Sequence, residues 1–152
     1  MATVQEEIGY TGGGARTSAY SLAPDVAIVV DVTFSTDVPD IDKKELGEHK
    51  LGGGPVLSRG SSSSNEVFKT LSQVAEKEGI PYTIQAAPKA TRTDADGIFL
   101  TRHGVPTGLV SVPNRYMHSP NEVVSLEDVQ NSARLIAAFI RHLNPDTDFT
   151  PR

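Results

Sequence analysis

The segment Asp25-Val26-Ala27-Ile28-Val29-Val30-Asp31 carries the clearest structural signal in the chain. Its apolar run at 27–30 is continuous and rich in β-branched residues, which is typical of a strand buried on both faces of a parallel sheet. The run is bracketed by aspartates and is far shorter than the ~20 residues that a membrane-spanning helix needs. We therefore predict a buried strand at 27–30 with helices covering both of its faces.

Strands and helices are predicted to alternate on both sides of this segment. The predicted strands lie at 2–5, 56–57, 81–84 and 105–112, and the predicted helices lie at 15–20, between the N-cap Asn65 and Gly79, at 94–102, and between Ser125 and Pro145. The polar stretch 35–54 is predicted to be a solvated loop. This order predicts an α/β fold, with three layers (α/β/α) and a mostly parallel sheet.

Composition limits the class of protein. The 152 residues are 38% hydrophobic and 22% charged, which suits a folded domain. A net charge of −5, from 14 basic and 19 acidic residues, argues against a nucleic-acid partner, because that affinity needs clustered cations. The absence of cysteine excludes disulfides, thiolate metal sites and a cysteine nucleophile, and it fits the reducing cytoplasm. No membrane partner is expected.

Acidic residues and one histidine follow the predicted strands. Glu6 and Glu7 come after the first strand, Asp31 after the second, and His118 lies in the irregular stretch 115–120 after a later strand. Ligands bind at the carboxyl ends of strands in open α/β sheets, and carboxylates with imidazole are donors that zinc or cobalt uses. Each residue also has an ordinary structural role, as a solvated charge, a turn former or a loop histidine, so spacing alone leaves the site open.

Several short motifs in order give the chain a family resemblance. They are Thr3-Val4-Gln5-Glu6-Glu7-Ile8-Gly9, residues 27–33, Leu51-Gly52-Gly53-Gly54-Pro55, Thr93-Asp94-Ala95, Gly104-Val105-Pro106-Thr107 and Arg115-Tyr116-Met117-His118-Ser119. From Thr3 to about Leu143 the chain resembles the catalytic domain of the glutamyl and tetrahedral aminopeptidases, which are co-catalytic di-metal peptidases. The resemblance implies the C-terminal portion of a di-zinc peptidase catalytic domain at 1–144, followed by a frayed tail at 145–152.

The resemblance also implies a role for each candidate residue. Glu6 matches the general base, Glu7 and His118 match ligands of one metal, and Asp31 matches a ligand of the second. The implied reaction removes N-terminal residues from peptides with the help of two divalent ions, zinc or cobalt. Neighbouring residues of a strand point to opposite sides, which agrees with different tasks for Glu6 and Glu7.

Part of the family's site has no counterpart in the chain. The family uses a further histidine with its orienting aspartate, and a bridging aspartate, that would precede Met1. His49, His103 and His142 match none of these. We therefore expect an incomplete metal site and an isolated chain that is a poor or inactive peptidase. The family's dimerisation insert would also precede Met1. Relatives form homo-dodecamers, but without this insert the homo-oligomeric state of this chain stays open.

Three weaker candidates and two other functions complete the sequence-based expectations. Gly53 and Gly54 let the backbone approach a bound peptide or simply form a turn, and Arg115 faces a substrate carboxylate or forms a surface salt bridge. Asp94 supports the site or caps its helix. One alternative function is a non-catalytic remnant or binding module with the same fold. Another is a glycosidase, since relatives carry an endoglucanase label, but a chain without tryptophan and with 6% aromatic residues offers few sugar platforms.

Overall fold

A computed structural model describes residues 1–4, 6–7, 12–39 and 41–150 of the chain. The helices are α1 (Gly13–Leu22), α2 (Lys43–Leu46), α3 (Asn65–Lys77), α4 (Asp94–Ile98) and α5 (Leu126–His142). The strands are β1 (Ala27–Phe34), β2 (Val56–Gly60), β3 (Thr83–Ala87), β4 (Thr107–Arg115) and β5 (Val123–Val124). Among the described residues, no helix has both the length and the apolar character needed to cross a membrane.

The strands form one mixed sheet in the order β1-β4-β2-β3, and β5 pairs with β4. The two long ladders are parallel: β1 pairs with β4, with Ala27 opposite Thr107, and β2 pairs with β3. The contacts of β4 with β2 and with β5 are antiparallel and short. The predicted α/β class with a mostly parallel sheet is confirmed.

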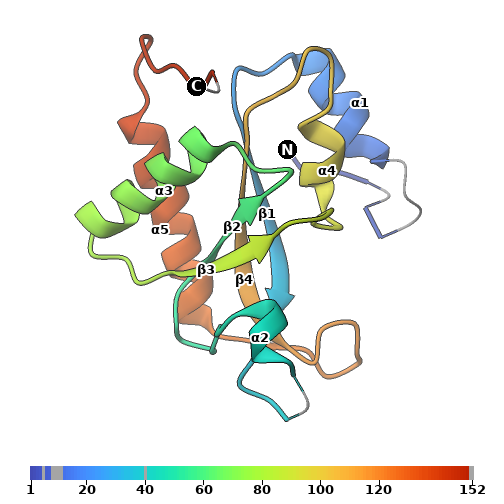
Figure 1. Cartoon of the computed structure of the whole chain (residues 1–152), viewed down its shortest axis with the longest axis vertical. Helices are drawn as coiled ribbons and strands as arrows, with labels where there is room; N and C mark the ends of the chain where they lie inside the picture. The colour runs from blue at the N-terminus through green and yellow to red at the C-terminus, as the bar shows by residue number, and fades with distance from the viewer. Residues whose placement is uncertain (5, 8–11, 40, 151–152) are drawn as a thin grey trace.

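Helices cover both faces of this sheet. Figure 1 shows α3 and α5 on one side of the strands and α1 and α4 on the other. Successive residues of a strand face opposite ways, and Val110 of β4 joins the core beneath α3 and α5 while Leu109 joins the core beneath α1 and α4. The predicted three-layer arrangement is therefore confirmed, with one apolar core on each side of the sheet.

Strand β1 differs from its prediction in length and in burial. It runs to Phe34, so Asp31 lies inside the strand, opposite Ser111, rather than at its end. β1 is an edge strand in this sheet, and Val30 is 55% exposed while Val29 is 7% exposed. The prediction of burial on both faces was only partly right. The face that carries Val29 lies against the core beneath α1 and α4, whereas on the other face Ile28 packs against the core beneath α3 and α5 but Val30 is exposed.

The N-terminal segment does not form the predicted strand. Ala2, Thr3 and Val4 lie outside any strand, and Gln5 falls outside the described residues. The Val4 carbonyl instead accepts a hydrogen bond of 3.0 Å from the Gly14 amide, which attaches the segment to the first turn of α1. The first amides of a helix have no acceptor within the helix, so the Gly14 amide can bind the N-terminal segment in place of a neighbouring strand.

The stretch 35–54 is more ordered than the predicted solvated loop. It contains α2 and the buried His49, whose Nδ1 lies 2.7 Å from the Thr83 hydroxyl and whose Nε2 lies 2.7 Å from the Leu46 carbonyl oxygen. The His49 amide also donates to the Thr36 hydroxyl. Polar partners buried together therefore organise a segment whose composition indicated only solvation.

Helix limits and faces also depart from the predictions. Ser64, rather than Asn65, caps α3, because its hydroxyl accepts from the Val67 amide. In α5 the spacing of Val129 and Ile140 along one side of the helix predicts a buried face, but these residues are 43% and 60% exposed. The buried face of α5 instead carries Asp128, Asn131, Ser132, Leu135, Ala138 and Phe139. The buried face could not be recognised from apolar spacing, because three of its residues are polar and are buried by partners distant in the sequence.

The C-terminal segment carries one buried aromatic residue. Phe149 is 7% exposed and stacks on Phe139 of α5, with ring centroids 6.1 Å apart. Phe149 lies within 145–152, the segment expected to be frayed, and this contact extends the core beneath α3 and α5.

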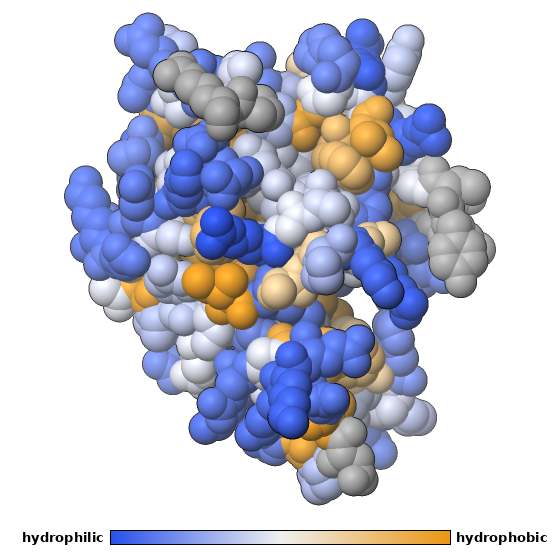
Figure 2. Space-filling model, viewed as in Figure 1, coloured by the Kyte–Doolittle hydropathy of each residue, from blue (hydrophilic) through white to orange (hydrophobic). Residues whose placement is uncertain are grey.

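The surface of the molecule is dominated by hydrophilic residues, and hydrophobic residues form small separate groups on the face shown in Figure 2.

Truncation of Leu135 tests the larger core. Leu135 is fully buried, so Leu135→Ala is expected to lower the free energy of unfolding by about 2–5 kcal/mol, through lost burial and the cavity that remains. Urea denaturation measures the change. Leu126→Ala provides a control in the same helix, since Leu126 is 82% exposed. Equal effects of the two substitutions would contradict this packing.

The buried His49 predicts a pH dependence of stability. Burial lowers the pKa of His49 in the folded chain, and the bond to the Leu46 carbonyl offsets only part of this effect. Below the unfolded value of about 6.5, the unfolded chain takes up a proton more readily than the folded chain, so stability falls as pH falls. Thermal unfolding between pH 7.5 and 5.5 measures the loss. His49→Gln should reduce this slope, whereas substitution of the exposed His142 should retain it.

Candidate functional site

An open cleft of about 750 Å³ lies between the N-terminal segment, the start of α1, the loop and helix around α4, and the loop after β4. Glu6 and Glu7 line it from the N-terminal segment, Asp94 from α4, and His118 from the loop that follows β4. These residues are far apart in the sequence. With Asp96, which also lines the cleft, the fold therefore gathers four carboxylates and one imidazole around it.

Glu7 and His118 form a close pair of predicted ligands. The His118 Nε2 lies 3.7 Å from the Glu7 Oε1, and both side chains are largely exposed, at 64% and 75% of their surface for His118 and Glu7. Two donors to one zinc ion each lie about 2.0–2.2 Å from the metal, so their mutual distance is about 3 Å or slightly more. The distance between the two groups is close to that spacing.

Glu6 and Asp31 face the same group of charges. Burial raises the pKa of Glu6, and the negative charges of Asp31, Glu7 and Asp94 raise it further, while His118 lowers it. Burial also raises the pKa of Asp31, an effect opposed by the Val32 amide, which donates to Asp31 Oδ1 at 2.7 Å. Each of the four residues predicted from the sequence therefore lies within electrostatic range of the others.

Asp94 connects the N-terminal segment to α4. Its carboxylate accepts a hydrogen bond from the Thr3 hydroxyl, three residues before Glu6. The N-cap of α4 is Thr93, whose hydroxyl accepts from the Ala95 amide, so the prediction that Asp94 caps the helix was wrong. The carboxylate of Asp94 is used instead to fix the segment that carries the two glutamates, and its charge adds to the negative potential of the cleft.

The types of donor atom suit a zinc-like ion, but the described residues do not provide a complete set of ligands. Two carboxylates and an imidazole are borderline donors of the kind that zinc or cobalt binds in hydrolytic sites. Within the part of the chain that the structure describes, no three acidic or histidine side chains converge tightly enough to hold a metal ion. The residues fit such a metal in chemistry, but the described side chains do not by themselves surround one.

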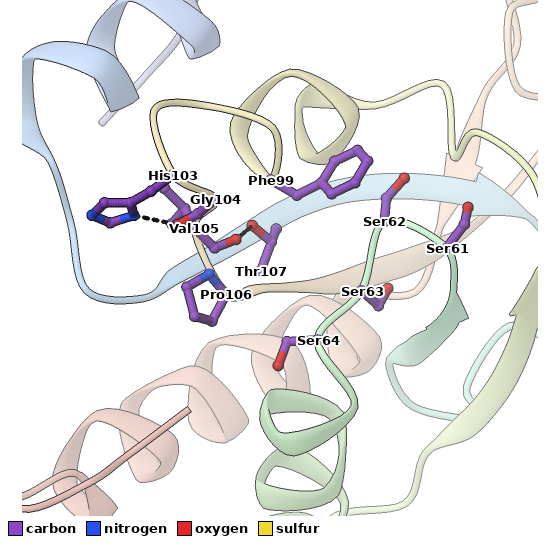
Figure 3. A pocket seen from close by; sticks show the side chains of 10 residues that line it. All are labelled: Ser61, Ser62, Ser63, Ser64, Phe99, His103, Gly104, Val105, Pro106 and Thr107. Carbon is purple, nitrogen blue, oxygen red and sulfur yellow. Dashed lines mark hydrogen bonds between the residues drawn. The ribbon is translucent and has the colours of Figure 1, made fainter. Parts of the chain in front are cut away.

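A second, smaller cavity of about 240 Å³ lies between the start of α3 and the loop before β4. Figure 3 shows the four serines 61–64 on one side of it and Phe99, Pro106 and Thr107 on the other. The Ser62 hydroxyl donates to Asp96 and the Thr107 hydroxyl donates to the Val105 carbonyl. These hydroxyls are already used inside the protein, so the cavity is a gap in packing between α3 and α4.

Gly53 and Gly54 are needed for a turn. The amides of Gly52 and Gly54 each donate at 2.8 Å to the carboxylate of Asp128, which is fully buried. Gly54 has φ +87°, and a Cβ there would come within 2.0 Å of the Pro81 carbonyl oxygen. Neither Gly53 nor Gly54 lines the cleft that contains the two glutamates. The turn interpretation explains both glycines, and no local sequence pattern indicates that Asp128 is the acceptor for its amides.

Arg115 forms the salt bridge that was its alternative interpretation. Its Nε lies 3.0 Å from Asp37 Oδ1 and its Nη2 lies 2.6 Å from Asp37 Oδ2, a two-pronged contact. The guanidinium holds the pKa of the Asp37 carboxyl well below its usual range. This pairing takes up the guanidinium edge that a substrate carboxylate would use, and it fixes the end of β4 to the loop after β1.

Comparison with known proteins places the chain among aminopeptidases. The sequence profile of M42 glutamyl aminopeptidases matches residues 1–135. A lysyl aminopeptidase of Pyrococcus furiosus is 39% identical over 151 residues, which cover 99% of this chain and 42% of the relative. The chain therefore spans about two fifths of the length of this relative.

Solved structures give the same result. An aminopeptidase of the archaeon Desulfurococcus kamchatkensis aligns with a TM-score of 0.84 at 42% identity, over 95% of this chain and 41% of that one. A TET1 peptidase of Pyrococcus horikoshii, described as able to assemble into a tetrahedron or a large octahedral shell, aligns with a TM-score of 0.71 at 30% identity, over 93% of this chain and 40% of that one. The fold of the chain is thus that of aminopeptidases.

Substitution of Asp128 tests the buried turn. Asp128→Ala leaves the amides of Gly52 and Gly54 without their acceptor, and we expect a loss of at least about 2 kcal/mol in the free energy of unfolding. Chemical denaturation measures the loss. Glu127→Ala removes a carboxylate from the neighbouring exposed position and should change stability little. A neutral Asp128→Ala would show that the carboxylate does not hold the turn.

Proposed function

Since the chain belongs to the M42 glutamyl aminopeptidase family, we propose that it is the part of a metal-dependent aminopeptidase that supplies the general base and three metal ligands. The observation that supports this proposal is that Glu6, Glu7 and His118 line one cleft and that Asp31 lies within electrostatic range of all three. The names of the relatives support the peptidase class, and the residues of the cleft support the chemistry.

Each residue has a proposed task. Glu7 and His118 would hold one divalent ion and Asp31 would hold a second, with zinc or cobalt as the metal and further ligands from outside this chain. A bound pair of such ions supplies an acidified water and a polarised scissile carbonyl. Glu6 would accept a proton from the attacking water and pass it to the leaving amine. Burial raises the pKa of Glu6, which suits a carboxyl that must both take and release a proton.

The charge of the cleft suits a peptide with a free N-terminus. Four carboxylates (Glu6, Glu7, Asp94 and Asp96) line it beside two guanidinium groups (Arg16 and Arg92), and this excess of carboxylates attracts the ammonium group of such a peptide. The cleft thus favours an exopeptidase that removes single N-terminal residues. We also propose assembly into a homo-oligomer, supported by the shells described for the Pyrococcus horikoshii relative, and a location in the cytoplasm, supported by the absence of cysteine.

The incomplete donor set has a consequence for the isolated chain. Glu7, Asp31 and His118 do not form a closed group, so the 152-residue chain is proposed to bind metal weakly and to be a poor or inactive peptidase by itself. The alternative is a non-catalytic remnant that keeps the fold and binds no metal. Metal affinity that depends on His118 separates these two possibilities.

A zinc titration of the purified chain provides the test. We expect calorimetry to detect Zn²⁺ binding that His118→Ala weakens by about tenfold or more, because an imidazole donor is lost. His103→Ala is the matched control, since His103 lies outside the cleft. The absence of any binding, or equal binding by the two variants, would support the remnant and contradict the proposed site.

Substitution of the proposed base gives a separate prediction. Glu6→Gln is expected to preserve Zn²⁺ binding and to lower whatever residual hydrolysis of a leucine anilide the zinc-loaded chain shows by about 10²–10⁴-fold. Glu66→Gln, in α3 and outside the cleft, should leave the rate unchanged. Rates that survive Glu6→Gln would show that another group moves the proton, and hydrolysis of a cellulose oligomer instead of the anilide would point to a glycosidase.

A further inference from the structure

The loop that carries His118 has a strained backbone. It connects the end of β4 at Arg115 to β5 at Val123, and these two residues are paired across its base. Within it Tyr116 and His118 have φ angles of 58° and 65°, in the left-handed region that residues other than glycine rarely adopt. Such conformations persist where surrounding contacts determine them, so the loop needs an anchor.

The carboxylate of Glu122 contacts both the loop and the sheet. Its Oε1 accepts the backbone amide of His118 at 2.5 Å, and its Oε2 accepts the side-chain amide of Asn114 at 3.0 Å. Asn114 is 2% exposed in β4, and its backbone carbonyl accepts the Ser35 amide at 2.9 Å. A rigid strand residue is therefore connected, through one carboxylate, to the backbone of His118.

The oxygen of the Asn114 side-chain amide supports a specific role for the contact between Asn114 and Glu122. Asn114 Oδ1 is buried and has no hydrogen-bond partner among the described residues, which is costly for a polar atom. The amide therefore gives up one hydrogen bond while its nitrogen donates to Glu122.

We propose that Asn114 and Glu122 are positioning residues that fix the turn of His118 and thereby aim its imidazole at Glu7. The inference rests on the proposed function, in which His118 binds a metal. Neither residue lines the cleft, so both act through the backbone of the loop. The 3.7 Å distance between His118 Nε2 and Glu7 Oε1 is the geometry that they maintain.

Two measurements on the full chain test this inference. Hydrogen exchange of the His118 backbone amide, followed by NMR, reports on the turn without any metal, and a Zn²⁺ titration reports on the imidazole. Glu122→Ala is expected to accelerate exchange of this amide by about tenfold or more. It is also expected to weaken Zn²⁺ binding by about 10–100-fold, as is usual when the group that orients a ligand is lost. Asn121→Ala, an exposed neighbour in the same loop, should change neither.

The unpartnered oxygen of Asn114 makes a rescue possible. Glu122→Gln still has one oxygen for the His118 amide, and a reversed Asn114 amide would offer Oδ1 to the new amide group, so this variant should retain most of the zinc affinity. Asn114→Asp places two carboxylates together and should behave like Glu122→Ala. The double variant Asn114→Asp with Glu122→Gln restores a donor and an acceptor, and it should recover both amide protection and affinity.

The outcomes separate this inference from the proposed function. Amide exchange unchanged by Glu122→Ala overturns the inference, whatever the metal does. If His118→Ala weakens zinc binding, a Glu122→Ala variant with faster exchange of the His118 amide but unchanged zinc affinity also overturns the inference. Zinc affinity that His118→Ala leaves unchanged contradicts the proposed function at His118. The single variant Glu122→Gln keeps the test decisive if Asn114→Asp does not fold.

Discussion

The parallel pairing of β1 with β4 is the constraint on which the rest of the molecule depends. It runs from Ala27 opposite Thr107 to Phe34 opposite Asn114, and it is the longest ladder in the described sheet. Parallel strands end on the same side of a sheet, so this pairing brings Asp31 of β1 and the His118 loop after β4 toward one region. Helix α4 and the N-terminal segment then add Asp94, Glu6 and Glu7 to that region.

Buried or paired charges fix the loops around this ladder. Asp128 gathers the amides of the glycine turn, Arg115 connects the end of β4 to Asp37, and Asp94 holds the N-terminal segment through Thr3. In each case a single carboxylate replaces the regular hydrogen bonds that a loop lacks. The site is therefore positioned by polar contacts between loops, over a sheet whose two apolar cores supply most of the stability.

Local patterns predicted what depends on local sequence. The amphipathic spacing of α3 and its glycine stop at Gly79 are confirmed, because a helix needs only its own residues and one covered face. The edge position of β1, the exposure of Val30 and the centre of the glycine turn at Asp128 depend on partners distant in sequence. For the site, the family resemblance supplied residue roles, and the structure adds the proximity of Glu7 to His118. The orienting contact of Glu122 gave no sequence signal, since an exposed glutamate in a loop is ordinary.

The open side of β1 has a practical consequence. In the described part of the chain β4 is the one strand bonded to β1, so the opposite row of backbone amides and carbonyls has no strand beside it. Exposed Val30 and Phe34 lie on this strand. Unpaired edges with apolar side chains act as templates for another chain. Concentrated solutions of the purified polypeptide should accordingly associate edge to edge, and a lysine in place of Val30 should keep the molecules apart.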